Sequence, residues 1–379
     1  MRQDPIQFIN EQRELIFQTY GELHQLAEPS WGEENTSKYI AEILRNAGLH
    51  VQTFTGHFGL VAEIKGEITD VIALRADLDA LVQEVDGIIR PNHSCGHDSH
   101  STMVLFTALA LAKSGQKFKH TVRFIFQPAE EKGEGALKMM EEGALRNVKF
   151  LGGIHLRPAI EVQYNCAAPV ILHGSTVSIK GVIKGVPAHA ARPAEGNNPL
   201  EAAALLIQAI RQIRLKDEGN YSIKITELHG GEASNLIPES SSFTFDLRAR
   251  TNDIMKEVIE KAEHIIKKMA ELTETTIEYK LVEYSPAAKK NLHAIELAES
   301  AILAILGKEG FQEVCNSPGA EDFHFYTLKN PEIAATMIGL GCDLHPGLHH
   351  PKMTFNHEAM IYGAQILTKL LLEADQKPW

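Results

Sequence analysis

The chain has 379 residues, 44% hydrophobic and 23% charged, which predicts a globular protein with a large core and two domains rather than a disordered or fibrous chain. The formal net charge of −12 argues against a nucleic-acid or anionic-membrane surface, because either would favour clustered Lys and Arg. The first residues contain no apolar targeting segment and no run attains the roughly 18 apolar residues of a spanning helix, so we expect a cytoplasmic protein without a membrane partner.

The first half of the chain alternates helical and strand-like segments. Apolar residues at helical spacing predict two helices over 5–47, and runs rich in Val, Ile and Leu predict strands after them. The strands are expected at 50–54, 60–64, 71–75 and 121–126, with a buried helix at 101–114. This alternation predicts an α/β fold, a mostly parallel sheet with helices on both faces, whose ligand crevice lies at the carboxyl ends of the strands.

A different pattern begins near residue 175 and predicts an inserted domain. A period-two strand pattern with glycines is followed by a long amphipathic helix over 199–214 and by a strand, a helix and a strand at 242–248, 253–272 and 276–282. From Leu292 the earlier alternation returns. We predict a discontinuous catalytic domain over 1–174 and 286–379, and an α+β, ferredoxin-like lid and dimerisation domain over 175–285.

The densest group of metal-capable side chains is the sequence HSCGHDSH at 93–100. Cys95 and His97 lie two residues apart, and Gly96 permits a turn that would let both bind one ion. A thiolate with an imidazole suits zinc, cobalt, nickel or manganese rather than magnesium or calcium. The alternative is a loop of surface histidines with a buried free thiol, since the chain has only four cysteines and reduced thiols are expected.

Two adjacent carboxylates, Glu130 and Glu131, follow the apolar strand over 121–126. At a buried strand end they would repel each other and lose hydration, and a bound cation removes that cost. One could bind the metal while the other accepts a proton from activated water. The alternative is a solvated acidic turn that continues into Lys132 and Glu134.

Other candidates are dispersed along the chain. His155 and His349 are single histidines, which are more often structural, but catalytic metal sites are commonly built from separated segments. Asp77 and Asp79 follow a strand and could bind metal, orient ligand histidines, or cap the next helix.

The inserted domain contributes polar residues on glycine-rich loops. A histidine, an asparagine and arginines there could bind an oxyanion and a substrate carboxylate, although all are equally compatible with ordinary turn or surface residues. The candidates are His189, Asn235, Arg248 and Arg250.

Eight motifs, in their order, resemble the aminoacylase and carboxypeptidase family of two-metal amidohydrolases. The most similar branch contains hippurate hydrolase, auxin-amino-acid conjugate hydrolase and N-acetyl-diaminopimelate deacetylase, and the resemblance extends from about Arg13 to Leu371. One such motif would be weak, whereas all eight in sequence are highly specific. The motifs are ALRADLDAL, HSCGHDSH, FQPAEEKGEGA, GIHLRP, HAARPAEGNNPLEAA, GGEASNLIP, GAEDFHFY and HHPKMTFN.

The resemblance implies two divalent metal ions per subunit, of zinc, manganese, cobalt or nickel. The implied metal ligands are Cys95, His97, Glu131, His155 and His349. Glu130 would be the general base and acid, and His189 would act in the site of the partner subunit of a homodimer. The residues expected to hold the polar end of the substrate are Asn235 and Arg248, and those expected around the metal ligands are Asp77, Asp79 and Asp98.

The implied activity is hydrolysis of the amide bond of small N-acyl amino acids or related amides. An aminopeptidase or dipeptidase of the same fold would instead prefer a free α-amine, and a non-catalytic ligand-binding relative would lack Glu130 or a ligand, none of which is missing. A phosphate-handling enzyme is disfavoured because no G-x-x-x-x-G-K-[ST] loop occurs. The chain departs from the family pattern in a short 82–94 segment without the usual proline after Leu81, and in Ala194 where a histidine is usual, so the substrate preference stays open.

Overall fold

The computed structural model describes residues 3–215 and 220–379 and divides the chain into two compact units. The first unit contains the residues up to Leu172, together with Lys289–Ser317 and Asp322–Trp379. The second contains His173–Ala288 and Pro318–Glu321. The lid and dimerisation role expected of the second unit stays a prediction.

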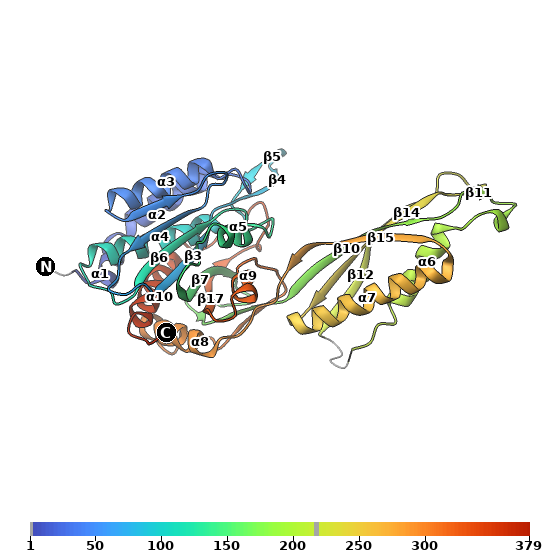
Figure 1. Ribbon diagram of the computed structural model, residues 1–379. Coiled ribbons are helices and arrows are strands. Elements are labelled where there is room, and N and C mark those ends of the chain that lie inside the picture. Colours follow the sequence, from blue (N-terminus) through green and yellow to red (C-terminus); the bar gives the residue numbers. More distant parts are fainter. Residues whose placement is uncertain (1–2, 216–219) are drawn as a thin grey trace. The chain divides into compact units, whose positions relative to one another are not determined.

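A seven-stranded, mostly parallel sheet forms the centre of the first unit, in the order β1-β2-β6-β3-β7-β17-β8 (Figure 1). The four strands β6, β3, β7 and β17 run parallel, while β1, β2 and β8 add antiparallel pairings at the two edges. The predicted fold class is therefore confirmed. The strand bounds are β1 His50–Thr53, β2 Leu60–Ile64, β3 Val71–Asp77, β6 Thr121–Gln127, β7 Val148–Pro158, β8 Ala167–Ala168 and β17 Ala334–Leu344.

Helices cover both faces of this sheet. The central strand β3 is therefore buried at every position, on both of its faces. Successive residues of β7 point to opposite faces: a Cβ at Gly152 would meet Leu370 of α10, and one at Gly153 would meet Phe323 just before α9. Three helices precede the sheet rather than the expected two, because the backbone leaves helical geometry at Gln12. The helices are α1 Pro5–Glu11, α2 Arg13–Leu26, α3 Glu34–Asn46, α4 His97–Lys113, α5 Gly135–Glu141, α8 Leu292–Leu306, α9 His324–Lys329 and α10 Glu358–Ala374.

A hairpin that we did not predict leaves the sheet after β3. Its strands are β4 Leu81–Val85 and β5 Ile88–Asn92, and its turn residues Asp86 and Gly87 both have positive φ. An Asp-Gly pair between apolar residues is a typical hairpin signal, so the sequence contained the information. Two further short strands pair with each other, β9 Ile171–His173 and β16 Cys315–Ser317.

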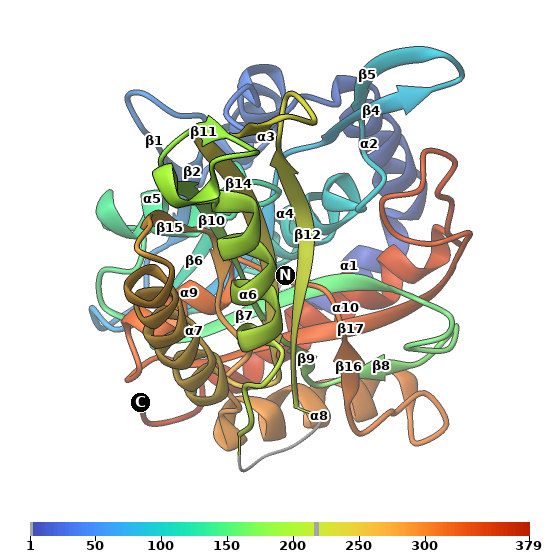
Figure 2. The same cartoon turned by 90° about the vertical axis from the view of Figure 1, so that its right-hand side faces the viewer.

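The second unit is a four-stranded antiparallel sheet, in the order β12-β14-β10-β15, with α6 and α7 packed against it (Figure 2). The edge strand β12 was not predicted, and the helix expected through Arg214 ends at Ile210. The elements are β10 Ser175–Lys184, β11 Ala188–His189, η1 Pro193–Glu195, α6 Pro199–Ile210, β12 Tyr221–Gly230, β13 Leu236–Ile237, β14 Ser240–Ala249, α7 Asn252–Thr273 and β15 Thr276–Ser285.

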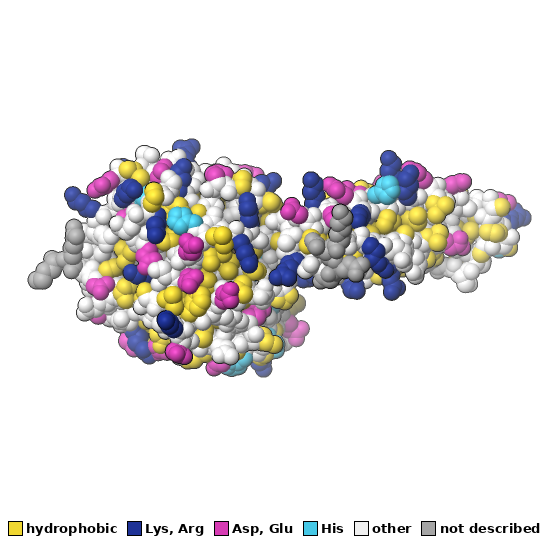
Figure 3. All heavy atoms as spheres, turned by 90° about the horizontal axis from the view of Figure 1, so that it is seen from below, with side chains coloured by type: hydrophobic (Ala, Val, Ile, Leu, Met, Phe, Trp, Pro, Cys, Tyr) yellow, Lys and Arg dark blue, Asp and Glu magenta, His cyan; other side chains and the backbone are white. Residues whose placement is uncertain are grey.

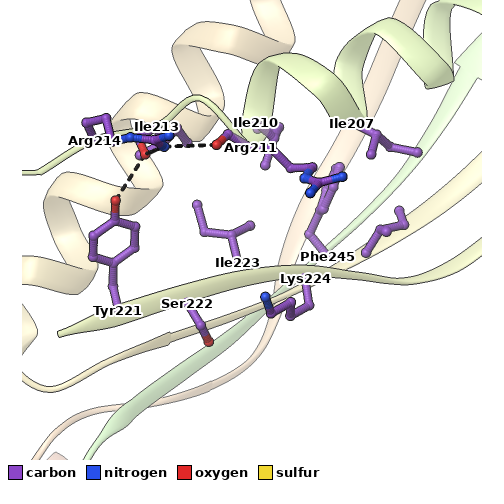
Figure 4. Close-up of a pocket in the computed structure, with 11 residues that line it drawn as sticks. Ile207, Ile210, Arg211, Ile213, Arg214, Tyr221, Ser222, Ile223, Lys224 and Phe245 are labelled. Carbon is purple, nitrogen blue, oxygen red and sulfur yellow. Dashed lines mark hydrogen bonds between the residues drawn. The ribbon is translucent and has the colours of Figure 1, made fainter. Parts of the chain in front are cut away.

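A pocket of about 580 Å³ opens between α6 and β12 (Figure 4). Ile207 and Ile210 of the helix face Ile223 and Phe245 of the sheet across it. The hydroxyl of Tyr221 donates a hydrogen bond of 3.0 Å to the carbonyl of Ile213 at one end. The pocket thus lies beside β12, which is one of the two edge strands of this sheet in the described part of the chain.

On the face of each unit shown in Figure 3, Lys and Arg side chains are interspersed with Asp and Glu. Among the described residues, no helix combines the length and the hydropathy needed to cross a membrane.

A buried ionic network connects the carboxyl end of β3 to a distant loop. Arg75, 2% exposed, donates to Asp77 at 2.5 Å, to Asp322 at 2.7 Å and, through Nε, to Gln127 at 2.9 Å. Asp322 also accepts from the backbone N–H of Ala136 at 2.9 Å. Because both carboxylates are buried, each depends on these partners to compensate for lost hydration.

We expect Arg75→Leu to lower the free energy of unfolding by about 3–5 kcal/mol, because it leaves buried carboxylates without their cation. Chemical denaturation monitored by circular dichroism measures this change. Lys38→Leu, which removes the exposed Lys38–Glu34 ion pair of the same unit, is the control and should cost less than about 1 kcal/mol. Equal losses in the two variants would contradict the structural role of the network.

Candidate metal centre

Four segments of the first unit bring the predicted ligands to the end of the sheet where the parallel strands terminate. Cys95 precedes α4 and His97 is its first residue, with Gly96 between them in the left-handed conformation at φ 87°. A Cβ at Gly96 would lie 3.0 Å from Leu156, so the close approach of the backbone to β7 also favours glycine here. The other candidate ligands lie in or after strands: Glu131 comes after β6, His155 lies in β7, and His349 follows β17.

The ligand atoms of these five residues lie close together. Cys95 Sγ is 3.7 Å from His155 Nε2, and Glu131 Oε1 is 3.8 Å from His97 Nε2 and 3.6 Å from His349 Nε2. Three overlapping groups each have all their ligand atoms within 4.8 Å of one another. These groups are Cys95, His97 and His155; Cys95, Glu131 and His349; and His97, Glu130 and Glu131. The structure thus brings together all five candidates from the sequence.

The residues present fit a bound cation. His97 Nε2 and Glu131 Oε1 are buried atoms that make no hydrogen bond within the described ranges 3–215 and 220–379. Leaving such atoms without a partner is unfavourable, and a cation between them would remove the cost. Burial also raises the pKa of Glu131 to about 7, although the nearby His97 opposes this shift. A divalent ion would hold the carboxylate ionised, because metal ligands bind in their deprotonated forms.

Hydrogen bonds to backbone carbonyls set the tautomers of two of the histidines. His97 Nδ1 lies 3.0 Å from the carbonyl of Asp79, and His155 Nδ1 lies 2.7 Å from the carbonyl of Leu156. A carbonyl oxygen only accepts, so both Nδ1 atoms must carry the hydrogen. In the neutral ring, Nε2 then presents its lone pair, which is the form that binds a metal. Burial lowers the pKa of His155 well below its usual value and favours this neutral form.

Of the three aspartates expected around the ligands, Asp79 contacts two ligand residues. Its Oδ1 lies 3.2 Å from His97 Nδ1, and its Oδ2 accepts from the backbone N–H of Glu131 at 3.0 Å. Asp77 instead bonds to Arg75 and to His100 Nδ1 at 2.8 Å. His100 in turn accepts from the N–H of Leu156 in β7.

The side chain of Asp98 forms its described hydrogen bonds with residues outside this cluster. Its carboxylate accepts from the backbone N–H of Ser99 at 2.8 Å and lies 2.7 Å from His24 Nδ1 on α2. Its described hydrogen bonds therefore tie the start of α4 to α2. The position of Asp98 around the metal ligands, which the resemblance implies, stays a prediction.

Glu130, the candidate general base, lies beside the ligands and is 9% exposed. Its Oε2 is 3.8 Å from His97 Nε2, and its Oε1 accepts from the backbone N–H of Asp322 at 3.4 Å. The residue before it, Ala129, has a positive φ of 53° although it is not glycine. This unusual turn after β6 directs two neighbouring carboxylates into one cluster.

The hairpin holds the loop that carries His349, a role the sequence analysis missed. His349 has a positive φ of 64°, and its N–H donates to the carbonyl of Ser94 at 2.8 Å. Gln83 donates to the carbonyl of His349 at 3.2 Å, and Asn92 donates both to Gln83 and to the carbonyl of Pro351. Nothing in the local sequence signals these bonds, because they join segments far apart in the chain.

The remaining candidates belong to the second unit. His189 of β11 pairs with Leu236 of β13, and the carbonyl of Asn235 accepts from the N–H of Ala190 at 3.0 Å, so His189 and Asn235 lie on neighbouring exposed segments. Arg248 of β14 is also exposed and forms an ion pair with Asp246 at 2.9 Å. Their roles toward a substrate stay predictions.

Comparisons with known proteins agree with this cluster. Residues 73–373 match the sequence model of peptidase family M20/M25/M40. N-acetylcysteine deacetylase of Bacillus subtilis is 31% identical over 366 residues, covering 92% of this chain and 94% of that protein. Hippurate hydrolase of Campylobacter jejuni is 28% identical over 369 residues, covering 93% and 94%.

A solved structure extends the similarity to the fold. The crystal structure of a Bacillus subtilis protein, described as a dinuclear metal binding peptidase from the M20 family, superposes with a TM-score of 0.83 at 27% identity, covering 97% of this chain and 99% of that one. The resemblance drawn from the eight motifs is confirmed. The chain belongs to peptidase family M20/M25/M40.

Proposed function

We propose that the protein is a metal-dependent amidohydrolase that cleaves the amide bond of small N-acyl amino acids or related amides. The observation that carries the proposal is the convergence of five candidate ligand side chains beside Glu130, to which we assign the proton transfer. The names of its relatives agree with this substrate class, since they include deacetylases of N-acetylcysteine, hydrolases of amino-acid conjugates and hippurate hydrolase.

Two divalent cations are the cofactors that we propose. The residues that would hold them are Cys95, His97, Glu131, His155 and His349. Such ions polarise a carbonyl and increase the acidity of water. The combination of thiolate, imidazole and carboxylate favours zinc, manganese, cobalt or nickel.

Glu130 would move the proton during the reaction. Its carboxylate accepts a proton from the attacking water as the new C–O bond forms at the acyl carbon, and it returns that proton to the amide nitrogen as the C–N bond breaks. The products are a carboxylic acid and a free amine. The 9% exposure of Glu130 favours this role, since a site largely closed to bulk water strengthens its interaction with charge that develops nearby.

Three residues of the second unit complete the proposal. His189 would stabilise the oxyanion by donating a hydrogen bond, and Asn235 and Arg248 would hold the carboxylate of the amino-acid part. All three side chains are exposed within their own unit, which leaves them available to a substrate.

The four free cysteines support a reducing, cytoplasmic location.

We also propose a homodimer in which His189 acts in the partner subunit. Two features of the second unit support it: β12 is an edge strand, and Leu205 and Leu228 on α6 and β12 are 48% and 47% exposed. An unpaired edge with apolar side chains favours association. Sedimentation equilibrium should give twice the mass of the chain, and a monomer at micromolar concentration would reject the dimer.

A hydrolysis screen on metal-reconstituted protein tests the activity. N-acetyl, benzoyl and longer-chain acyl amino acids should be hydrolysed, while free dipeptides should react much more slowly. Release of the amine, followed by a colorimetric assay, is the measurement. A preference for substrates with a free α-amine would instead identify an aminopeptidase or dipeptidase of the same fold.

Two variants separate proton transfer from metal binding. Glu130→Ala should lower kcat by roughly 10²- to 10⁴-fold with near-normal metal content, because it removes the proton carrier and leaves the five ligands. Cys95→Ala should lose at least one bound ion per chain, because it removes a ligand. Metal content by elemental analysis and kcat are measured on both. Full activity in the first variant, or unchanged metal stoichiometry in the second, would exclude the assigned role.

A further inference from the structure

Glu33 is a buried carboxylate that the proposed mechanism does not use. It lies at the start of α3 with 0% exposure, far in sequence from every candidate ligand. Its Oε1 accepts from the backbone N–H of Ala129 at 2.8 Å and from that of Trp31 at 3.0 Å. A carboxylate buried so completely is costly, and its second oxygen, Oε2, makes no hydrogen bond with a described residue.

Both donors are non-glycine residues in the left-handed region. Trp31 has φ 69° and Ala129 has φ 53°, so a single oxygen atom bridges two backbone positions that L-residues rarely adopt. Such conformations persist only where the surrounding structure holds them. Ala129 directly precedes Glu130 and Glu131, so its φ sets the direction in which the chain presents both carboxylates.

The segment that contains Glu33 is joined to the same turn in two further ways, once through Asp79 and once directly. Ser30 donates to Asp79 at 2.7 Å, and the same Asp79 oxygen accepts from the N–H of Glu131. The indole N–H of Trp31 donates to Glu134 at 2.9 Å. The segment 30–33 thus bonds directly to the amide of residue 129 through Glu33, and indirectly to the amide of residue 131 through Asp79.

We propose that Glu33 is a positioning residue, whose carboxyl oxygen keeps Ala129 in the left-handed conformation and so directs Glu130 and Glu131 into the metal centre. The proposal rests on the proposed function. Burial raises the pKa of Glu33 to about 7, with the backbone hydrogen bonds opposing the shift. Because Oε1 can accept a hydrogen bond whether or not the group is charged, the role needs an acceptor at this position rather than a negative charge.

Three substitutions at Glu33 test this role. Glu33→Gln keeps an acceptor of the same length and should retain kcat and metal affinity. Glu33→Met removes the acceptor and should lower kcat by about ten- to a hundredfold, with KM little changed, because the proton carrier is misplaced. It should also weaken metal affinity by roughly tenfold, because Glu131 is redirected. Asp is favoured at helix starts, so the Glu33→Asp variant should fold normally. Its shorter side chain does not reach the N–H of Ala129, so kcat and metal affinity should fall as they do in Glu33→Met.

Glu28 provides a matched control in the same segment. Its side chain accepts from the N–H groups of Asn35 and Thr36 and does not contact the turn at Ala129. Glu28→Met should therefore lower the melting temperature without lowering kcat of the folded protein. Ala129→Gly, placed in the Glu33→Met background, should restore part of kcat, because glycine adopts positive φ without steric cost.

The measurements are kcat, KM, thermal melting and metal affinity by competition with a chelating dye. Wild-type kcat and metal affinity in both Glu33→Met and Glu33→Asp would overturn the proposal, and so would equal losses in Glu33→Gln and Glu33→Met. If the wild-type protein hydrolyses none of the amides, the proposed function fails. The metal affinities of the same variants then still decide whether Glu33 positions the glutamate turn.

Discussion

The cost of burying ligand atoms without partners is the constraint on which the site depends. His97 Nε2 and Glu131 Oε1 are buried 3.8 Å apart, and neither makes a hydrogen bond with a described residue. The opposite nitrogen of His97 is already bonded to Asp79, so the ring cannot turn to relieve this cost without losing that bond. Buried polar atoms without hydrogen-bond partners destabilise the fold, and a divalent cation bound between these two atoms would remove that cost.

Left-handed backbone is the second feature that the ligand segments share. Gly96, Ala129 and His349 all have positive φ: Gly96 lies between two candidate ligands, His349 is one, and Ala129 precedes Glu130 and Glu131. The two that are not glycine are held by hydrogen bonds from distant segments, Ala129 by Glu33 and His349 by Ser94 and Gln83. The geometry of the centre is therefore maintained by residues that are not themselves candidate ligands.

The ionic network below the site connects these features to the sheet. Arg75 on β3 joins Asp77, which bonds to His100 at the start of α4, and Asp322, which accepts from the N–H of Ala136 at the start of α5. The N–H of Asp322 in turn donates to Glu130. The strand ends, the helix starts and the candidate base thus share one set of buried polar contacts, in which the loss of one member affects the others.

The sequence by itself determined the family, the parallel α/β sheet and the five ligand candidates, because motif residues and strand ends are local properties of the chain. It also contained the Asp86-Gly87 pair, which is a typical signal of the hairpin turn found between β4 and β5. Only the tertiary structure decided that Asp79 contacts His97, that Asp98 bonds to His24, and that Glu33 and Gln83 bond to Ala129 and His349. The physical reason is that these contacts join residues that are remote in sequence, and their geometry exists only once the strands have paired.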